Sequence, residues 1–229
     1  GINFNKKPLA LSTRRALQKC ILSSDFSKVL PNTKRTSSLV FSSSIELKPT
    51  MDSVRTKNQQ SITLLAAEKF KNNEKFLSYF SAIGNCSNSE INIKFGSFRK
   101  ILKDFRNGIG DLIYKGDGMQ NYELTSIYDS FRASSNSNVS GYVDEKLDKL
   151  INECEKSSLV RIKSKCIANI EYYLSNVVAF VPLVHITAKE AYGSKFSKKL
   201  LNKNSNLIWE FPFSKSFLKG AHNEKDQEL

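Results

Sequence analysis

ITLLAAEKFKNNEKFLSYFSAIGNCSNSEINIKF, at residues 62–95, and GSFRKILKDFRNGIGDLIY, at residues 96–114, form the most regular part of the sequence. Short apolar or alternating runs predict strands in this stretch, and apolar side chains that recur at helical spacing predict helices between them. The expected order is strand, helix, strand, helix, strand. Because successive parallel strands need a crossover helix, we predict an open α/β sheet with helices packed on its faces.

The bounds of these elements follow from periodicity and from capping residues. Gly84 is expected to end the first helix, and Ser97 is expected to open the second. The expected strands and helices are, in order, a strand at 62–67, a helix at 72–83, a strand at 91–95, a helix from 97 to 105 and a strand at 111–114.

The pattern extends outward in both directions with more irregular spacing. On the amino-terminal side we expect a short strand at 1–5, a helix capped by Ser12 and Thr13, and a long surface connection at 25–60. On the carboxyl-terminal side we expect helices at 123–131, 144–155 and 159–174, strands at 177–184 and 207–213, one domain over 1–220 and a disordered tail at 221–229.

The composition is that of an ordinary globular protein with a basic surface. The chain has 229 residues and a formal net charge of +13, but its 35 Lys and Arg are mixed along the sequence with 22 acidic residues. A solvated basic surface is therefore expected in preference to a polyanion site, and no specific nucleic-acid partner is expected. The longest apolar run, at 177–184, is far short of the roughly 20 residues that span a bilayer.

The four cysteines do not form a metal motif. Cys20, Cys86, Cys154 and Cys166 lack the Cys-x-x-Cys spacing, and the chain has two histidines, so no metal site is expected. One or two disulfides are possible in an oxidising compartment. Because Cys20 and Cys166 lie on predicted apolar helix faces, a buried free thiol is the expected state of both.

The loop at 116–122 is the leading site candidate. It follows the predicted strand at 111–114, and open α/β sheets place ligands at the carboxyl ends of their strands. The nucleophile, zinc-protease and phosphate-loop motifs are all missing from the sequence, so neither an enzyme nor a cofactor is expected.

Several short stretches, taken in order, resemble the family 5 extracellular solute-binding proteins, the oligopeptide and dipeptide receptors of ABC transporters. NKKPL at 5–9, with RRAL at 14–17, is similar to a strand-to-helix passage of that family. DLIYKG at 111–116 resembles the strand that leads into its ligand loop. NVSGY at 138–142, followed by LDKLI at 147–151, is the most similar passage, and VPL at 181–183 resembles a further strand.

The resemblance implies a type II periplasmic-binding-protein-like fold, with a mixed open sheet flanked by helices. The matched stretches belong to the second half of these receptors, so the chain is expected to be a C-terminal lobe whose N-terminal lobe is missing. A truncation, a proteolytic product and a naturally split chain each remain open. The function implied is capture of peptides or peptide-like small solutes by closure of two lobes. The implied location is periplasmic or extracellular, with the full-length receptor associated with the membrane and delivering its solute to a membrane ABC permease.

The resemblance also indicates which residues contact the ligand. In peptide-binding relatives the loop carries an aspartate for the α-ammonium group of the ligand, and the matching positions here are Asp117 and Gln120. A neutral amide at position 120 supplies only a hydrogen bond, so either Asp117 takes the charge role or the ligand has no free amine. Asp117 is equally consistent with a turn residue. The full set of candidate ligand-binding residues is Tyr114, Asp117, Met119, Gln120, Tyr122 and Asn138.

Two other functions remain open at this point. The same fold could be the ligand-sensing domain of a transcriptional regulator, working in the cytosol with reduced cysteines. A basic nucleic-acid-binding protein is the third reading, and the absence of interleaved aromatic and basic residues argues against it.

Overall fold

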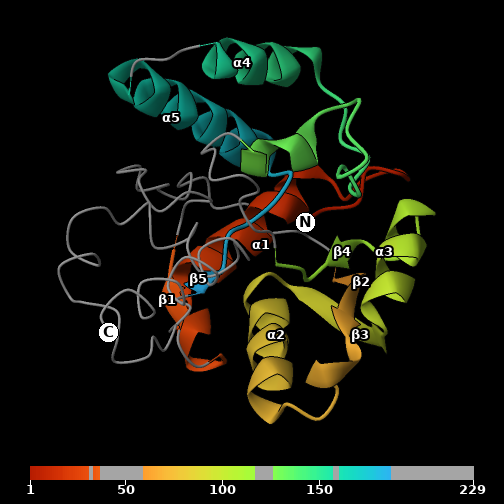
Figure 1. Cartoon of the computed structure of the whole chain (residues 1–229). Helices are drawn as coiled ribbons and strands as arrows, with labels where there is room; N and C mark the ends of the chain where they lie inside the picture. The colour runs from red at the N-terminus through yellow and green to blue at the C-terminus, as the bar shows by residue number, and fades with distance from the viewer. Residues whose placement is uncertain (31–32, 37–58, 117–125, 157–159, 187–229) are drawn as a thin grey trace, which may run out of the picture. The chain divides into compact units, whose positions relative to one another are not determined.

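The computed structural model describes residues 1–30, 33–36, 59–116, 126–156 and 160–186 (Figure 1). All of these residues belong to one compact unit, Gly1–Thr187. The predicted strand at 207–213, the domain boundary at 220 and the tail at 221–229 lie outside the described residues.

The central sheet is the parallel α/β arrangement that the sequence predicts. Its strands are β2 (Gln60–Ala67), β3 (Ser89–Gly96) and β4 (Leu112–Ile113), in the order β3-β2-β4 with all pairs parallel. Helix α2 (Glu74–Cys86) connects β2 to β3, and α3 (Phe98–Arg106) connects β3 to β4. The predicted alternation of strands and helices is confirmed.

The two faces of β2 belong to different cores because successive side chains of a strand point to opposite faces. Leu64, 2% exposed, packs with residues of α2 and of α1 (Leu11–Ser23) in one apolar cluster. Leu65, also 2% exposed, packs on the other face with Ile101 and Phe105 of α3. The sheet is therefore covered on both faces, as a parallel sheet requires.

Side chains cap three of the helices at their amino-terminal ends. Asn73, Ser97 and Asp144 each accept a hydrogen bond from the backbone N–H three residues later, at 3.0, 3.3 and 3.1 Å. The predicted cap of the first helix is wrong, because α1 begins at Leu11 and its N-cap is Ala10. The hydroxyl of Thr13 instead donates to the side-chain oxygen of Gln60 in β2, at 2.9 Å.

Gly84 does not end α2, which continues to Cys86. Gly84 is buried where the helix approaches β3, and a Cβ atom there would lie 2.6 Å from the carbonyl oxygen of Ser89. The glycine is needed for this close approach rather than for a helix stop.

The second half of the described chain is helical. It contains the 3₁₀ helix η3 (Ser126–Phe131) and the α-helices α4 (Glu145–Glu155) and α5 (Val160–Val177), as the helical patterns predict. Tyr128 of η3 is fully buried among them and donates to the buried carboxylate of Glu171 at 3.0 Å. The shared core is apolar and includes Leu147, Ile151, Ile167, Ile170, Leu174 and Phe180.

The predicted strand at 177–184 is wrong. Helix α5 occupies Val177, and Val178 has a positive φ of 49°, a conformation that breaks both helix and strand and that a β-branched residue rarely adopts. The strand begins only at the end of the apolar run, as β5 (Val184–Ile186), and it pairs antiparallel with β1 (Thr33–Arg35).

The amino-terminal end and the segment after α1 also differ from expectation. Residues 1–5 do not form a strand, although Ile2 makes one antiparallel bridge to Leu112 of β4. The segment that was expected to be a surface connection opens with the 3₁₀ helix η1 (Phe26–Lys28), and its Phe26 is 1% exposed.

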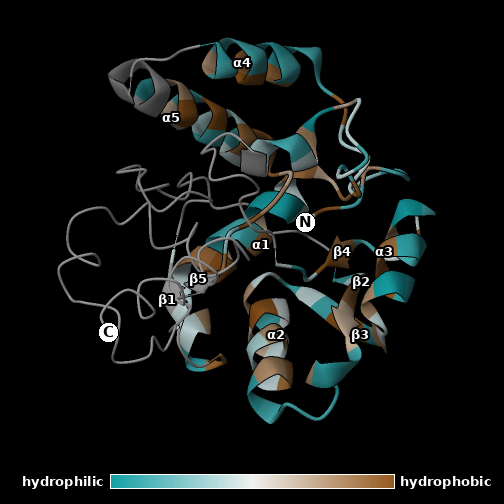
Figure 2. Ribbon diagram, viewed as in Figure 1, coloured by the Kyte–Doolittle hydropathy of each residue, from teal (hydrophilic) through white to brown (hydrophobic). Residues whose placement is uncertain are grey.

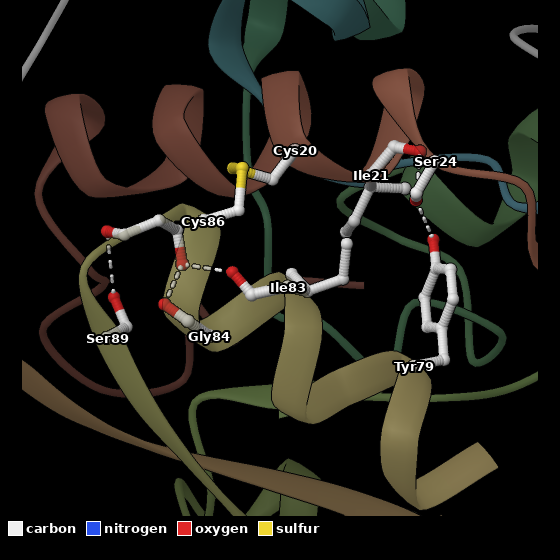
Figure 3. Close-up of a disulfide and its surroundings, with 9 residues drawn as sticks. Cys20, Ile21, Ser24, Tyr79, Ile83, Gly84, Cys86 and Ser89 are labelled. Carbon is white, nitrogen blue, oxygen red and sulfur yellow. Dashed lines mark hydrogen bonds between the residues drawn. A yellow bond between two sulfur atoms is a disulfide. The ribbon is translucent and has the colours of Figure 1, made fainter. Parts of the chain in front are cut away.

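Both pairs of cysteines form disulfides, so the expectation of buried free thiols is wrong. Cys20 of α1 is joined to Cys86 of α2, with Cα atoms 5.9 Å apart (Figure 3). Cys154 of α4 is joined to Cys166 of α5, with Cα atoms 5.5 Å apart. Each disulfide therefore links two helices that already pack together.

Candidate functional site

The carboxyl ends of β2 and β4 lie side by side. Leu65 of β2 pairs with Ile113, and the backbone N–H of Tyr114 continues the pairing by donating to the Leu65 carbonyl oxygen at 2.9 Å. The chain then leaves β2 through the 3₁₀ helix η2 (Glu68–Phe70). Open α/β sheets bind ligands at this edge, so the structure places Tyr114 at the predicted position of the site.

Tyr114 lies among aromatic side chains. Its ring centroid is 5.5 Å from that of Phe26, 5.2 Å from those of Phe70 and Phe76, and 6.4 Å from that of Phe80. Burial raises the pKa of Tyr114 to about 12, so the phenol is neutral at physiological pH. The side chain is only partly buried, and a neutral amphipathic ring in this setting offers both stacking area and a hydrogen-bonding tip.

An apolar pocket of about 50 Å³ lies beside Tyr114. Its walls come from the amino-terminal residues, α1, α2, the sheet and the segment that follows α5. The wall residues include Leu17, Ile21, Leu64, Phe80, Tyr114 and Leu183. Such a pocket can accept a small apolar group but provides little polar recognition of its own.

Asn138, the second described candidate, holds its own loop together. Its amide donates to the carbonyl oxygens of Arg132 at 3.1 Å and Tyr142 at 2.7 Å, and its oxygen accepts from the Ser140 hydroxyl and the Gly141 N–H. All the hydrogen-bonding positions of the amide are thus occupied within the loop. A ligand contact by Asn138 remains a prediction.

The structure does not bring the two described candidates together. Tyr114 packs in the cluster of α1 and α2, whereas the neighbour of Asn138, Val139, packs in the cluster of α3 on the opposite face of the sheet. The other four candidates, Asp117, Met119, Gln120 and Tyr122, lie outside the described residues, and their roles remain predictions.

Asn3 and the motif residue Asn5 have a structural role that the sequence did not reveal. Asn3, 1% exposed, donates to the carbonyl oxygens of Phe105 and Gly110 at 3.0 and 2.9 Å. Asn5 donates to the carbonyl oxygen of Val139 at 3.0 Å and also to Asn3. These two amides connect the end of α3 to the loop before α4. The spacing of two residues is their only sequence signal.

Arg14 makes a comparable connection between α1 and α5. Its guanidinium donates to the carbonyl oxygens of Leu9 and Val177, and its central carbon lies 5.3 Å from the ring centroid of Phe4. The motif arginine therefore joins the start of α1 to the end of α5.

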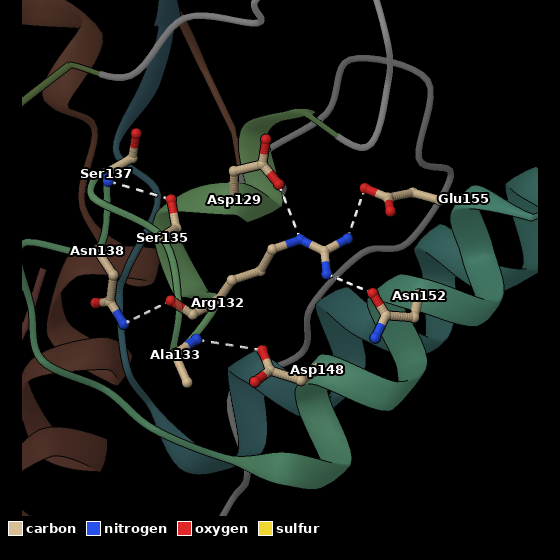
Figure 4. Close-up of polar contacts among 9 residues, drawn as sticks. All are labelled: Asp129, Arg132, Ala133, Ser135, Ser137, Asn138, Asp148, Asn152 and Glu155. Carbon is tan, nitrogen blue, oxygen red and sulfur yellow. Dashed lines mark hydrogen bonds and ion pairs between the residues drawn. The ribbon is translucent and has the colours of Figure 1, made fainter.

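A second arginine, Arg132, forms polar contacts with residues of both η3 and α4. Arg132 forms ion pairs with Asp129 at 2.9 Å and Glu155 at 2.6 Å, and it donates to the Asn152 side chain (Figure 4). The side chain of Arg132 is 15% exposed, so this network fixes η3 against α4.

Asp144 joins the start of α4 to α5. Its carboxylate accepts from the hydroxyls of Tyr142 and Tyr173, each at 2.7 Å. Burial raises the pKa of Asp144, but the hydrogen bonds from the two tyrosines and from the backbone outweigh it and hold the pKa below its ordinary value. Asp144 is therefore ionised at neutral pH.

The part of the chain that the structure describes contains no cluster of His, Cys, Asp and Glu able to hold a metal ion. No helix within these same ranges is long and apolar enough to cross a membrane.

Comparison by sequence finds no match, because no family model and no curated protein matches the chain. Solved structures do match. OppA from Haemophilus influenzae, in complex with RPPGFSPFR, has a TM-score of 0.65 at 18% identity, over 80% of this chain and 41% of its own. DppA from Helicobacter pylori, an ABC transporter-associated periplasmic binding protein in complex with the peptide STSA, has a TM-score of 0.65 at 14% identity, over 80% and 40%.

A structure with a different bound molecule matches equally well. NikA from Brucella suis, in complex with Fe(III)-EDTA, has a TM-score of 0.64 at 16% identity, over 84% of this chain and 47% of its own. The chain thus spans less than half the length of each of these proteins. The chain has the type II periplasmic-binding-protein-like fold of these proteins.

Proposed function

We propose that the chain is the C-terminal lobe of an ABC-transporter solute-binding protein, which captures peptides or peptide-like small solutes between two lobes. The observation that carries the proposal is the fold likeness, which extends over 80% of this chain but only 41% of OppA from Haemophilus influenzae. This is the relation expected between one lobe and a two-lobed receptor. The proposal assigns no catalytic residue and no cofactor.

The ligand would lie at the carboxyl edge of β2 and β4. Tyr114 is the described residue at that edge with both a flat apolar surface and a polar tip, and the pocket beside it would receive an apolar group of the solute. Asp117, Met119, Gln120 and Tyr122 follow directly after this edge in the sequence, and we propose them as the polar part of the site.

Closure of the two lobes would follow from a ligand-induced shift of the equilibrium from the open to the closed state. A ligand closes a two-lobed receptor only if it makes more favourable contacts in the closed state than in the open state. This chain supplies one wall of such a cleft, so it should bind solutes weakly by itself. The complementary N-terminal lobe and a membrane ABC permease are the proposed protein partners.

The two disulfides support a periplasmic or extracellular location. Structural disulfides persist in oxidising compartments and are rare in the cytosol. Cys20–Cys86 and Cys154–Cys166 both join packed helices, which is more consistent with a secreted receptor than with a cytosolic regulator built on the same fold.

Tyrosine-selective NMR of the 229-residue chain tests this proposal. Short peptides are added at millimolar concentration, and the ring signals of Tyr114 and Tyr173 are assigned with the variants Tyr114→Phe and Tyr173→Phe. We expect the Tyr114 signals to shift with weak saturation, whereas those of Tyr173, in the helical half, stay unchanged. Shifts confined to tyrosines other than Tyr114 and Tyr122 would contradict the site, and tight binding by the isolated chain would contradict the closure of two lobes.

A further inference from the structure

The pocket beside Tyr114 has an apolar lining. Among the described residues that line it, none has a charged side chain, and the only polar side-chain atom is the hydroxyl oxygen of Tyr114. Figure 2 shows brown, hydrophobic ribbon on β4 and on parts of α1 and α2, which supply walls of the pocket. A charged group placed there would lose its water without gaining a partner. The pocket therefore suits an uncharged, apolar part of a ligand.

The volume of the pocket distinguishes aliphatic from aromatic groups. In proteins, a preformed cavity of about 150 Å³ lined by leucine, isoleucine and phenylalanine binds benzene. The pocket beside Tyr114 has about 50 Å³, roughly a third of that volume. By proportion it has room for about two or three carbon atoms. A valine side chain is of this size, whereas a phenyl ring is too large.

The buried walls of the pocket resist widening. Leu17 of α1 and Phe80 of α2 are 1% and 4% exposed and belong to one core cluster. The rings of Phe80 and Tyr114 contact each other, with centroids 6.4 Å apart. The disulfide Cys20–Cys86 also joins α1 to α2, the helices that carry Leu17 and Phe80. Because interiors are close-packed, a larger group could enter only by displacing these side chains at a substantial cost.

Leu183 is a wall residue of a different kind. It is half-buried, and it comes from the segment that follows α5 rather than from a helix or the central sheet. Its side chain packs against the same core cluster as Leu17 and Phe80. Truncation of Leu183 would therefore enlarge the pocket without removing a fully buried core side chain.

We propose that the pocket selects solutes by size: it binds a small aliphatic group of about two or three carbon atoms and rejects an aromatic ring, with Leu183 setting the upper limit. The inference rests on the proposed function, because it places the solute against Tyr114. Each buried methylene group raises affinity about fourfold until the pocket is full, and a group that does not fit gains nothing from it.

Tyrosine-selective NMR titration of the full chain tests the size selection. The probes are tripeptides of two glycines and one variable residue, which is glycine, alanine, valine or phenylalanine and occupies each of the three positions in turn. Shifts of the Tyr114 ring signals give the dissociation constants. We expect one position at which valine binds about tenfold more tightly than glycine, whereas phenylalanine binds no more tightly than glycine.

A pair of leucine variants tests the role of Leu183. Leu183→Ala should bind the phenylalanine peptide at least as tightly as the valine peptide, because the shortened side chain leaves room for the ring. The control Leu150→Ala makes the same truncation at a half-buried position of α4 and should leave the order of the peptides unchanged. Circular dichroism checks that both variants fold, and the titration of the parent protein tests the size selection without them.

The outcomes separate this inference from the proposed function. A parent protein whose Tyr114 signals shift, but which binds the phenylalanine peptide as tightly as the valine peptide at every position, would overturn the size selection alone. An unchanged order of peptides in a folded Leu183→Ala variant would overturn the role of Leu183. Peptides that leave the Tyr114 signals unshifted would refute the proposed solute site and the size selection with it.

Discussion

Removal of the Cys20–Cys86 disulfide should destabilise the protein more than removal of Cys154–Cys166. The two are well matched for comparison, because each joins two packed helices and each contains one buried cysteine, Cys20 or Cys154. Their main difference is the length of chain that they close. The relevant variants replace both cysteines of a pair by alanine.

The magnitude follows from the entropy of the unfolded chain, which a crosslink lowers by an amount that grows with the logarithm of loop length. For Cys20–Cys86, with a separation of 66 residues, this stabilisation is about 4.4 kcal/mol at room temperature. For Cys154–Cys166, with a separation of 12 residues, it is about 2.8 kcal/mol. The expected difference between the variants is therefore about 1.5 kcal/mol.

Urea denaturation under oxidising conditions, followed by circular dichroism, measures both losses. We expect each variant to unfold at lower urea than the parent, with the Cys20/Cys86 variant the less stable of the two. Equal losses, or a larger loss for Cys154/Cys166, would refute the reasoning from loop length. A parent whose unfolding is unchanged by a reductant would refute the presence of the disulfides themselves.

Three further predictions concern single residues. Asn3→Leu should lower the free energy of unfolding by about 3 kcal/mol or more, measured by urea denaturation, because it leaves buried backbone groups without partners. The control Asn92→Leu, at an exposed position of β3, should change it by no more than about 0.5 kcal/mol. Equal losses would contradict the buried role of Asn3. Gly84→Ala should destabilise the protein despite the better helix propensity of alanine, because the new methyl group meets a backbone oxygen, and a more stable variant would show that α2 is not so close to β3. Asp144→Asn should melt at a lower temperature than the parent at neutral pH. Because the folded pKa of Asp144 lies below its ordinary value, the ionised carboxylate stabilises the parent above the ordinary pKa, and this stabilisation is lost as pH falls below about 4. A difference in melting temperature that persists in acid would contradict this role.

The parallel sheet could be predicted because its strands are covered on both faces. Buried strands read as continuous apolar runs, as in β2, and the helices between them show one apolar side, as α3 does with Ile101 and Phe105. These patterns depend on neighbours in the sequence. The caps at Asn73, Ser97 and Asp144 are local contacts too, although the sequence analysis predicts only the one at Ser97.

The errors concern features set by distant parts of the chain. Gly84 resembled a helix stop because only the fold shows how close β3 lies. Val178 lies in an apolar run that suggested a strand, but the run turns at a positive φ and its start belongs to α5. Pairing of Cys20 with Cys86 needs two helices to meet, and no spacing rule predicts it.

The position of the candidate site follows from a general rule, whereas the surroundings of its residues do not. The rule for open sheets located the carboxyl edge of β4, and Tyr114 lies there. The aromatic surroundings of Tyr114 come from η1, η2 and α2, which no local pattern connects with it. Asn138 was chosen from a sequence resemblance, and its amide holds the loop before α4.

A crystal structure of the chain grown or soaked with a short peptide at high concentration tests the proposed solute-binding role most directly. The account predicts peptide at the carboxyl edge of β2 and β4, in contact with the ring of Tyr114 and open on the side where a second lobe would close. A structure in which the chain itself covers that edge, with no peptide against Tyr114, would contradict it.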